Sequence, residues 1–125
     1  MKQFLESYTA KIVESGVTLL EGIRPALQLN IPDIAEYSNV TFDLATGVTD
    51  QERVLSPVDG AKFLVLEYDK DITIKLNANS NTAIVLNTYG TPAAGKFFLM
   101  SAATTSVFFS NASGSVAKIK MFYGY

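Results

Sequence analysis

The chain contains the run Ala61-Lys62-Phe63-Leu64-Val65-Leu66-Glu67-Tyr68, which is apolar at almost every position. This run predicts a strand that is buried on both faces, either by the fold alone or by the fold on one face and a partner on the other. After the polar turn Asp69-Lys70-Asp71, residues 72–76 alternate as Ile-Thr-Ile-Lys-Leu. Such a period of two is typical of a half-buried strand.

Working outward from this pair, the C-terminal two-thirds of the chain continues as short strands between turns. Residues 77–81 form an Asn-rich turn cluster, since asparagine tolerates positive φ and bonds its own backbone. Further strands are expected at residues 40–44, 82–86, 96–100, 107–109 and 116–123. In the last of these, one face is predicted to carry Ala117, Ile119, Met121 and Tyr123, and the other Lys118, Lys120 and Phe122.

This spacing predicts an all-β fold. Strands separated by roughly 8–12 residues with turn signals between them indicate a sandwich or a barrel. No helical pattern separates them, so a parallel α/β sheet is disfavoured. We predict an antiparallel β-sandwich of jelly-roll type, with an N-terminal arm or short helix. The 125 residues fit one domain, with residues 39–125 as the core sandwich and residues 1–38 as the arm or hairpin.

The N-terminal third allows two predictions. A short helix would have one apolar face, formed by Phe4, Leu5, Tyr8 and Ile12. A hairpin would have strands at residues 8–14 and 17–20 around a Ser15-Gly16 turn, which the β-branched residues favour. Residues 32–37 are predicted to form one helical turn that starts at Pro32. Residues 46–59 are predicted to be mainly a long loop.

The composition excludes most of the common catalytic mechanisms. The chain has no His and no Cys, which excludes Ser-His-Asp triads, thiolate nucleophiles and the usual zinc ligands. The formal charge is −2 and the ten basic residues are scattered, so we expect no nucleic-acid partner. There is no apolar run of membrane-spanning length and no signal-peptide pattern. We therefore expect a protein that is not an enzyme, needs no cofactor and does not enter a membrane.

Two other groups of residues are candidate sites. Glu67, Asp69 and Asp71 alternate, which could indicate a Ca²⁺ site or an acid–base pair, but a solvated turn is preferred because calcium loops need more ligands and a glycine. A sugar-binding module would use an exposed aromatic side chain. For that alternative the candidate ligand residues are Asn77, Asn79, Asn81 and Tyr89.

Apolar residues outside a single core layer indicate an interface. A sandwich has one inner layer, yet residues 97–100 are apolar on both faces, and only 18% of the residues are charged. An exposed apolar side chain among polar neighbours can mark a contact surface. We predict a homo-oligomer, with these candidate interface residues: Phe4, Leu5, Phe122 and Tyr125.

The C-terminal half also resembles a family. The segments that carry the resemblance are Gly60-Ala61-Lys62-Phe63-Leu64-Val65-Leu66, Ile72-Thr73-Ile74-Lys75-Leu76-Asn77, Phe97-Phe98-Leu99-Met100 and Val107-Phe108-Phe109-Ser110-Asn111. Over residues 60–125 the chain resembles the small β-sandwich structural proteins of tailed bacteriophages, such as head decoration and tail accessory proteins. The resemblance implies a virion protein, assembled in the host cytoplasm, that binds itself, with a trimer favoured, and the major capsid or tail protein. A capsid decoration protein is expected first, and a tail or connector component second.

Overall fold

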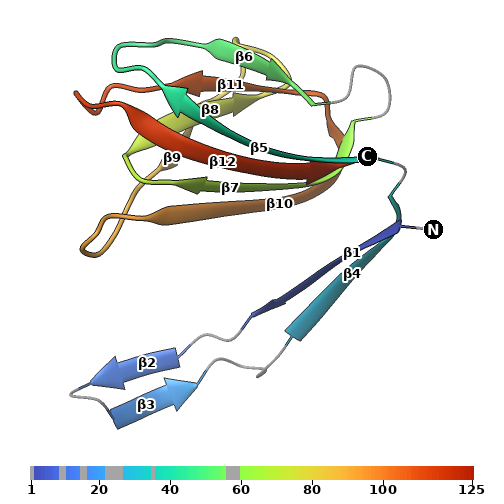
Figure 1. Cartoon of the computed structure of the whole chain (residues 1–125), viewed down its shortest axis with the longest axis vertical. Coiled ribbons are helices and arrows are strands. Elements are labelled where there is room, and N and C mark those ends of the chain that lie inside the picture. The colour runs from blue at the N-terminus through green and yellow to red at the C-terminus, as the bar shows by residue number, and fades with distance from the viewer. Residues whose placement is uncertain (1, 9–10, 15–16, 22–26, 35, 56–59) are drawn as a thin grey trace. The chain divides into compact units, whose positions relative to one another are not determined.

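The computed structural model describes residues 2–8, 11–14, 17–21, 27–34, 36–55 and 60–125. The chain divides into two compact units, residues 1–34 and residues 35–125. In the described ranges all regular secondary structure consists of β-strands, and no helix is present (Figure 1). These ranges contain no helix with the length and apolar character that a membrane crossing requires.

The C-terminal unit consists of two four-stranded antiparallel sheets. Its strands are β5 (Tyr37–Leu44), β6 (Gln51–Val54), β7 (Ala61–Tyr68), β8 (Ile72–Leu76), β9 (Ile84–Leu86), β10 (Gly95–Thr104), β11 (Ser106–Ser110) and β12 (Ala117–Gly124). One sheet, called the β7 sheet, has the order β10-β7-β12-β5, and the other, called the β8 sheet, has the order β6-β11-β8-β9. The all-β, antiparallel part of the fold prediction is confirmed.

The inward-facing residues of the two sheets share one apolar core. On β12, Ala117, Ile119 and Met121 are buried while Lys118 and Lys120 are exposed, as the alternation predicted. Core residues come from strands of both sheets and include Leu44, Leu66, Ile74, Val107 and Phe109. The core therefore lies between the sheets, in the arrangement expected of a sandwich.

Strand β7 is buried on both faces, as predicted. Leu64 belongs to the core, whereas Phe63 and Val65 point to the opposite face and are nevertheless only 1% and 7% exposed. In the strand register, Val65 lies between Phe98 of β10 and Phe122 of β12. The rings of Phe63 and Phe122 meet edge to face, with centroids 5.1 Å apart. A second apolar layer thus lies outside the β7 sheet.

Strand β6 corrects the prediction of a long loop at residues 46–59. It pairs with β11 at the edge of the β8 sheet, with Glu52 exposed and Arg53 half-buried. The guanidinium carbon of Arg53 lies 4.0 Å from the centre of the Phe42 ring. Its charged residues concealed the strand, but charges suit an edge because they discourage pairing with another chain. The remaining strand predictions are confirmed with small differences at the ends, and residues 56–59 lie outside the described residues.

The N-terminal unit contains two separate two-stranded antiparallel ladders. In one, β1 (Lys2–Tyr8) pairs with β4 (Leu27–Ile34), and in the other, β2 (Lys11–Glu14) pairs with β3 (Val17–Glu21). The β2–β3 ladder matches the hairpin alternative. The residues on which the helix alternative rested are in strands, which suits β-branched residues such as Ile12 and Val13. The predicted Ser15-Gly16 turn lies outside the described residues.

The predicted helical turn at residues 32–37 is wrong where the structure describes it. Pro32 lies within β4, and Tyr37 begins β5. Between the pairs Phe4–Ile31 and Lys2–Ile34 the register shifts, so Pro32 occupies an irregular position of the ladder. Proline within a sheet is found at such positions because it cannot donate a ladder hydrogen bond. Ala35 lies outside the described residues.

Candidate functional site

Four connections meet at one end of the C-terminal unit, to the left in Figure 1. They join β5 to β6, β7 to β8, β9 to β10 and β11 to β12, and residues from all four line an open depression of about 590 Å³. We call it the loop-end depression. Its lining combines the apolar side chains of Val48 and Val85 with the polar side chains of Asp69, Asp71 and Ser110.

Asn111 fixes one wall of the loop-end depression. Its side-chain Nδ2 donates to the carbonyls of Leu44 at 2.9 Å and Ser115 at 2.8 Å. Its Oδ1 accepts from the backbone N and the Oγ of Ser113 at 3.0 and 2.7 Å. The backbone N of Gly47 also donates to the Asn111 carbonyl at 2.8 Å. Asn111 is 1% exposed, so this buried amide joins the β5–β6 and β11–β12 connections.

The carboxylates of Asp69 and Asp71 are each held through one oxygen. The backbone N of Lys118 donates to Asp69 Oδ1 at 2.7 Å, and the backbone N and Oγ1 of Thr88 donate to Asp71 Oδ1 at 2.7 and 2.8 Å. The Thr88 hydrogen bonds lower the pKa of Asp71 from its ordinary value because they stabilise the carboxylate. No described residue donates to Oδ2 of either side chain. Glu67 does not line the loop-end depression, but it lines a second depression together with Asp69.

The β9–β10 connection contributes Thr88 and Ala93 to the lining of the loop-end depression and carries Tyr89 directly after Thr88 in the chain. Tyr89 and Ala94 exchange two backbone hydrogen bonds of 2.9 and 3.0 Å, and the Tyr89 side chain is 76% exposed. Tyr68 anchors the same connection, because its hydroxyl donates to the Asn87 carbonyl at 3.2 Å. Burial raises the pKa of Tyr68, and electrostatic interactions with Tyr89 and Asp71 raise it further. Tyr89 is therefore an exposed aromatic ring on a fixed hairpin.

The structure separates the predicted ligand loop at residues 77–81 from Tyr89. The loop follows β8, whereas Tyr89 follows the antiparallel neighbour β9, so the two lie at opposite ends of the unit. Asn77 Oδ1 accepts from the Thr105 backbone N at 2.8 Å, and Asn81 Nδ2 donates to the Leu76 carbonyl at 2.7 Å. These two asparagine side chains hold the turn itself.

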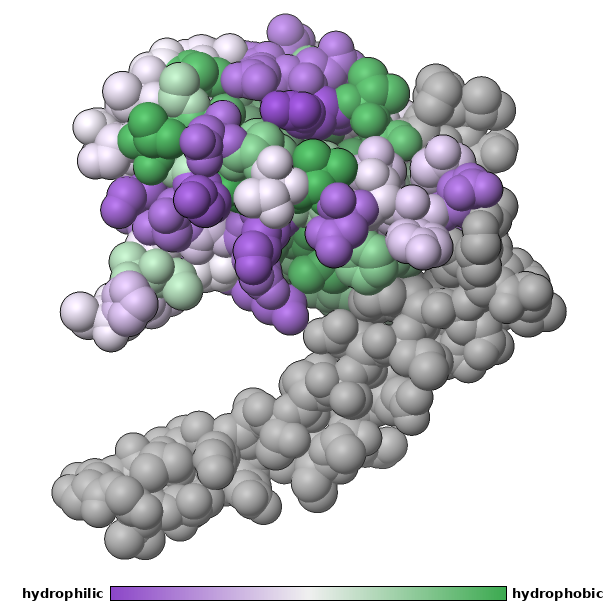
Figure 2. Space-filling model, in the orientation of Figure 1, coloured by the Kyte–Doolittle hydropathy of each residue, from purple (hydrophilic) through white to green (hydrophobic). Residues whose placement is uncertain are grey.

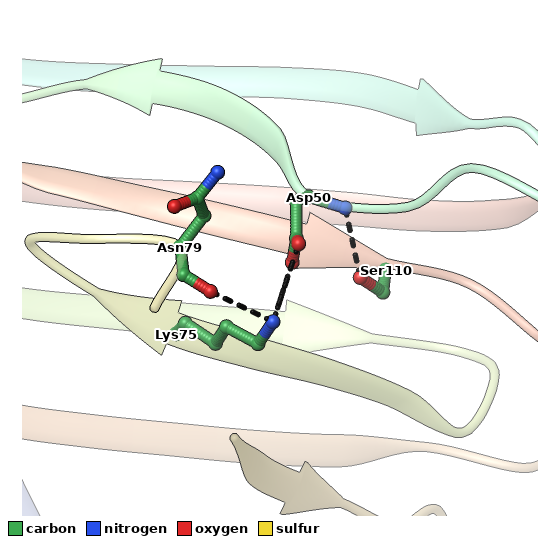
Figure 3. Close-up of polar contacts among 4 residues, drawn as sticks. All are labelled: Asp50, Lys75, Asn79 and Ser110. Carbon is green, nitrogen blue, oxygen red and sulfur yellow. Dashed lines mark hydrogen bonds and ion pairs between the residues drawn. The ribbon is translucent and has the colours of Figure 1, made fainter. Parts of the chain in front are cut away.

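Asn79 contributes its backbone to a polar contact on the β8 sheet (Figure 3). Lys75 Nζ donates to the Asn79 carbonyl at 2.9 Å and lies 3.0 and 3.2 Å from the two carboxylate oxygens of Asp50. The backbone N of Asp50 donates to Ser110 Oγ at 2.9 Å. The Asn79 side chain points away from Lys75. Lys75 therefore ties the loop at residues 77–81 to the start of β6.

An outer cluster of apolar side chains lies on the outer face of the β7 sheet. We define it as Tyr37, Phe63, Val65, Phe98 and Phe122. The rings of Tyr37 and Phe122 meet edge to face with centroids 6.3 Å apart, and Tyr37 is 61% exposed. On the face of the C-terminal unit seen in Figure 2, hydrophobic residues are interspersed with hydrophilic ones.

A row of charges crosses the same sheet. In the register, Glu67 lies between Lys96 and Lys120, and these three residues line two shallow depressions of about 490 and 300 Å³. Lys118 lines the larger one. Sequence reasoning missed this row because its members come from three strands, and only the register brings them together.

The predicted interface residues are divided between the two units. Phe122 belongs to the outer cluster, and Tyr125 exchanges two backbone hydrogen bonds of 2.9 Å with Glu36, which extends the β5–β12 pairing. Phe4 and Leu5 lie in β1, opposite Ile31 and Asn30 of β4. The structure thus groups Phe122 and Tyr125 on one sheet.

Among the described residues, no three Asp or Glu side chains gather closely enough to hold a metal ion.

Comparison with known proteins does not indicate a function. No family model matches the chain, and no curated protein or solved structure shows significant similarity to it. The function must therefore be argued from the fold and its surfaces.

Proposed function

We infer that the C-terminal unit is a jelly roll. Its eight strands lie in the orders β10-β7-β12-β5 and β6-β11-β8-β9. Of the seven connections between consecutive strands from β5 to β12, six pass from one sheet to the other, and only the β8–β9 connection stays within a sheet. This supports two interleaved Greek keys, the topology of the jelly roll. Viral capsid and lectin domains use that architecture, which directs attention to assembly and to ligand binding.

We propose that the chain is a non-enzymatic structural protein of a virion and that it associates with copies of itself. The outer cluster is the observation that carries this proposal. A sandwich needs only one inner layer, whereas here Phe63 and Val65 are buried in a second layer on the far side of the β7 sheet. Tyr37 and Met100, which are 61% and 48% exposed, add apolar surface to that side of the sheet. Burying such surface between copies stabilises an assembly by roughly 25 cal/mol per Å².

The N-terminal unit supports the same proposal. Below about 40 residues a folded unit usually needs disulfides, metals or association, and an isolated two-stranded ladder is marginal in water. The unit comprises residues 1–34, and the chain has neither Cys nor His. Contact with a neighbouring subunit supplies the burial that these ladders need, so the unit acts as an assembly arm.

The particular role proposed is capsid decoration on the head of a tailed bacteriophage. The resemblance of residues 60–125 to phage structural proteins supports it, and closed symmetric oligomers are the common outcome of self-association. A trimer that bridges major capsid proteins, added in the host cytoplasm, would multiply each weak contact by symmetry. With a formal charge of −2 and no basic run, the partner is protein rather than nucleic acid.

The test of self-association is the solution mass of the full chain by light scattering after gel filtration. We expect a mass that is a small multiple of 13.6 kDa, three-fold for the trimer. Tyr37→Ala should lower this mass because it removes exposed apolar surface from the outer cluster. Val85→Ala is the matched control, since Val85 is 65% exposed on the other sheet. A chain that is monomeric at every concentration overturns the association proposal.

The virion part of the proposal has a separate test. Particles purified from a lysate of cells that encode this chain are analysed by quantitative mass spectrometry. A decoration protein is present in many copies per head, whereas a tail or connector component is present in few copies. Absence of the chain from the particles rules out both roles.

A further inference from the structure

We propose that the loop-end depression binds a neutral carbohydrate, with Asp71, Asp69 and Tyr89 as the contact residues. This site is at the end of the C-terminal unit, whereas the proposed subunit contacts involve the outer face of the β7 sheet. The inference therefore goes beyond the structural role and does not depend on it. It rests on a concave surface of about 590 Å³, on two fixed carboxylates and on one exposed aromatic ring.

The carboxylates are oriented before any ligand arrives. Thr88 holds Asp71 Oδ1 through two hydrogen bonds, and the backbone N of Lys118 holds Asp69 Oδ1. Both side chains line the depression, and Oδ2 of each receives no hydrogen bond from the described residues. A fixed carboxylate oxygen is a strong acceptor for a hydroxyl group. Fixing it in advance lowers the entropy cost of binding.

The surrounding connections are also held in place. Asn111 joins two of them through its buried amide, and Tyr68 ties its hydroxyl to Asn87 of a third. Tyr89 extends from the hairpin closed by Ala94 and is largely exposed. Preformed concave sites with a few placed polar groups are the usual form of a small-molecule site.

The chemistry of the lining selects the ligand class. Asp69 and Asp71 outnumber Lys70, which also lines the depression, so the lining carries a net negative charge that disfavours an anion. The described residues offer no third acidic ligand for a metal ion. A sugar presents hydroxyl donors on its rim and C–H groups on its faces. The rim suits the carboxylates, and the C–H faces suit Val85 of the lining. The exposed ring of Tyr89, the residue after the lining residue Thr88, would add a second apolar contact. A neutral sugar therefore fits both the carboxylates and the apolar side chains of this surface.

The test begins with the full-length chain on a glycan array that carries neutral and amine-bearing glycans. The best neutral hit is then titrated into isotope-labelled protein and followed by NMR. We expect chemical-shift changes to concentrate at residues 69–73, 88–93 and 110–113. Asp71→Asn should weaken binding roughly tenfold or more, because a hydrogen bond to a charged acceptor is worth at least about one decade of affinity. Asn can still accept the Thr88 hydrogen bonds, so the fold is kept.

Two controls make the outcome decisive. Asp43→Asn removes an exposed carboxylate that does not line the depression and should leave the affinity unchanged. Tyr89→Ala should weaken binding, while Val54→Ala, at an exposed apolar position on β6, should not. Three results overturn the proposal: no neutral glycan binds, binding is unaffected by Asp71→Asn and Tyr89→Ala, or only amine-bearing glycans bind and salt removes them.

Discussion

Gly95 of β10 lies directly opposite Tyr68 of β7, and a Cβ at Gly95 would overlap the Tyr68 ring. Gly95 is not among the glycines with positive φ. Glycine is therefore required here because a side chain would collide with Tyr68, and not because of the backbone conformation. The ring of Tyr68 is buried, and its hydroxyl is bonded to Asn87. It cannot move aside without losing that hydrogen bond.

Gly95→Ala should therefore lower the free energy of unfolding by about 2 kcal/mol or more, the usual cost of forcing atoms into a packed site. Gly114→Ala is the control, because Gly114 has φ of +82° and open space around it, and backbone strain alone should cost about 1 kcal/mol. Urea unfolding measures both. In a Tyr68→Ala background the cost of Gly95→Ala should nearly vanish, and an unchanged cost would show that the ring is not its cause.

Asn111→Ala should be among the most damaging polar substitutions in the C-terminal unit. It removes donors from the carbonyls of Leu44 and Ser115 and the acceptor of Ser113. Leaving a buried carbonyl without a partner costs about 1–3 kcal/mol for each group. Asn81→Ala, which removes one hydrogen bond from an exposed turn, should cost less than about 1 kcal/mol. Equal losses in thermal or urea unfolding would contradict the structural role of Asn111.

Lys75 and Asp50 should show measurable coupling in a double-mutant cycle. Their side chains are 25% and 24% exposed and lie 3.0 Å apart at the closest oxygen. Partial burial should give a coupling free energy of about 1 kcal/mol, at the upper end for surface ion pairs. Asp50→Asn keeps a residue type that tolerates the positive φ of 51°, and Lys75→Met keeps the aliphatic stem.

Salt provides the check on this ion pair. The coupling between Lys75 and Asp50 should fall as sodium chloride is raised towards 1 M, where the screening length is about 3 Å. Coupling that does not change with salt would mean that packing, and not charge, joins the two side chains.

Asp71 should make folding depend on pH in the acid range. Its folded-state pKa is depressed by the Thr88 hydrogen bonds, so its contribution to stability is present above the unfolded-state value of about 3.9. That contribution is lost as the pH falls through the lower folded-state pKa. The unfolding midpoint of Asp71→Asn should therefore decline less than that of the unchanged chain between about pH 5 and pH 2. Asp43→Asn provides the comparison, and an Asp71 variant with an unaltered acid profile would refute the assignment.

The sequence predicted the strands that have a strong hydrophobic pattern. It did not predict the features that depend on how the strands pair with one another. Residues 61–68 and 72–76 are strands with the predicted bounds. The continuous apolar run predicted a strand buried on both faces, and the regular alternation predicted a strand buried on one face. Strand β6 was missed because edge strands tolerate charge, and Pro32 suggested a helix because its place in an irregular ladder is not visible locally. Asp69 and Asp71 were grouped with Glu67 from their alternation, but the hydrogen bonds that hold the two aspartates come from Lys118 of β12 and Thr88 of the β9–β10 connection, which are distant in sequence. Tyr89 and the loop at residues 77–81 were grouped by composition, and the antiparallel pairing of β8 with β9 sets them apart.

The paired backbones of Glu36 and Tyr125 mean that the C-terminal unit is nearly a closed loop of chain. Two hydrogen bonds of 2.9 Å hold these residues side by side, so a short linker could join residue 125 to residue 36. New ends could then be opened in the exposed connection between β8 and β9, at residues 82–83. Domains with adjacent termini commonly tolerate such circular permutation. The unit is therefore a scaffold whose entry and exit points can be moved around its perimeter.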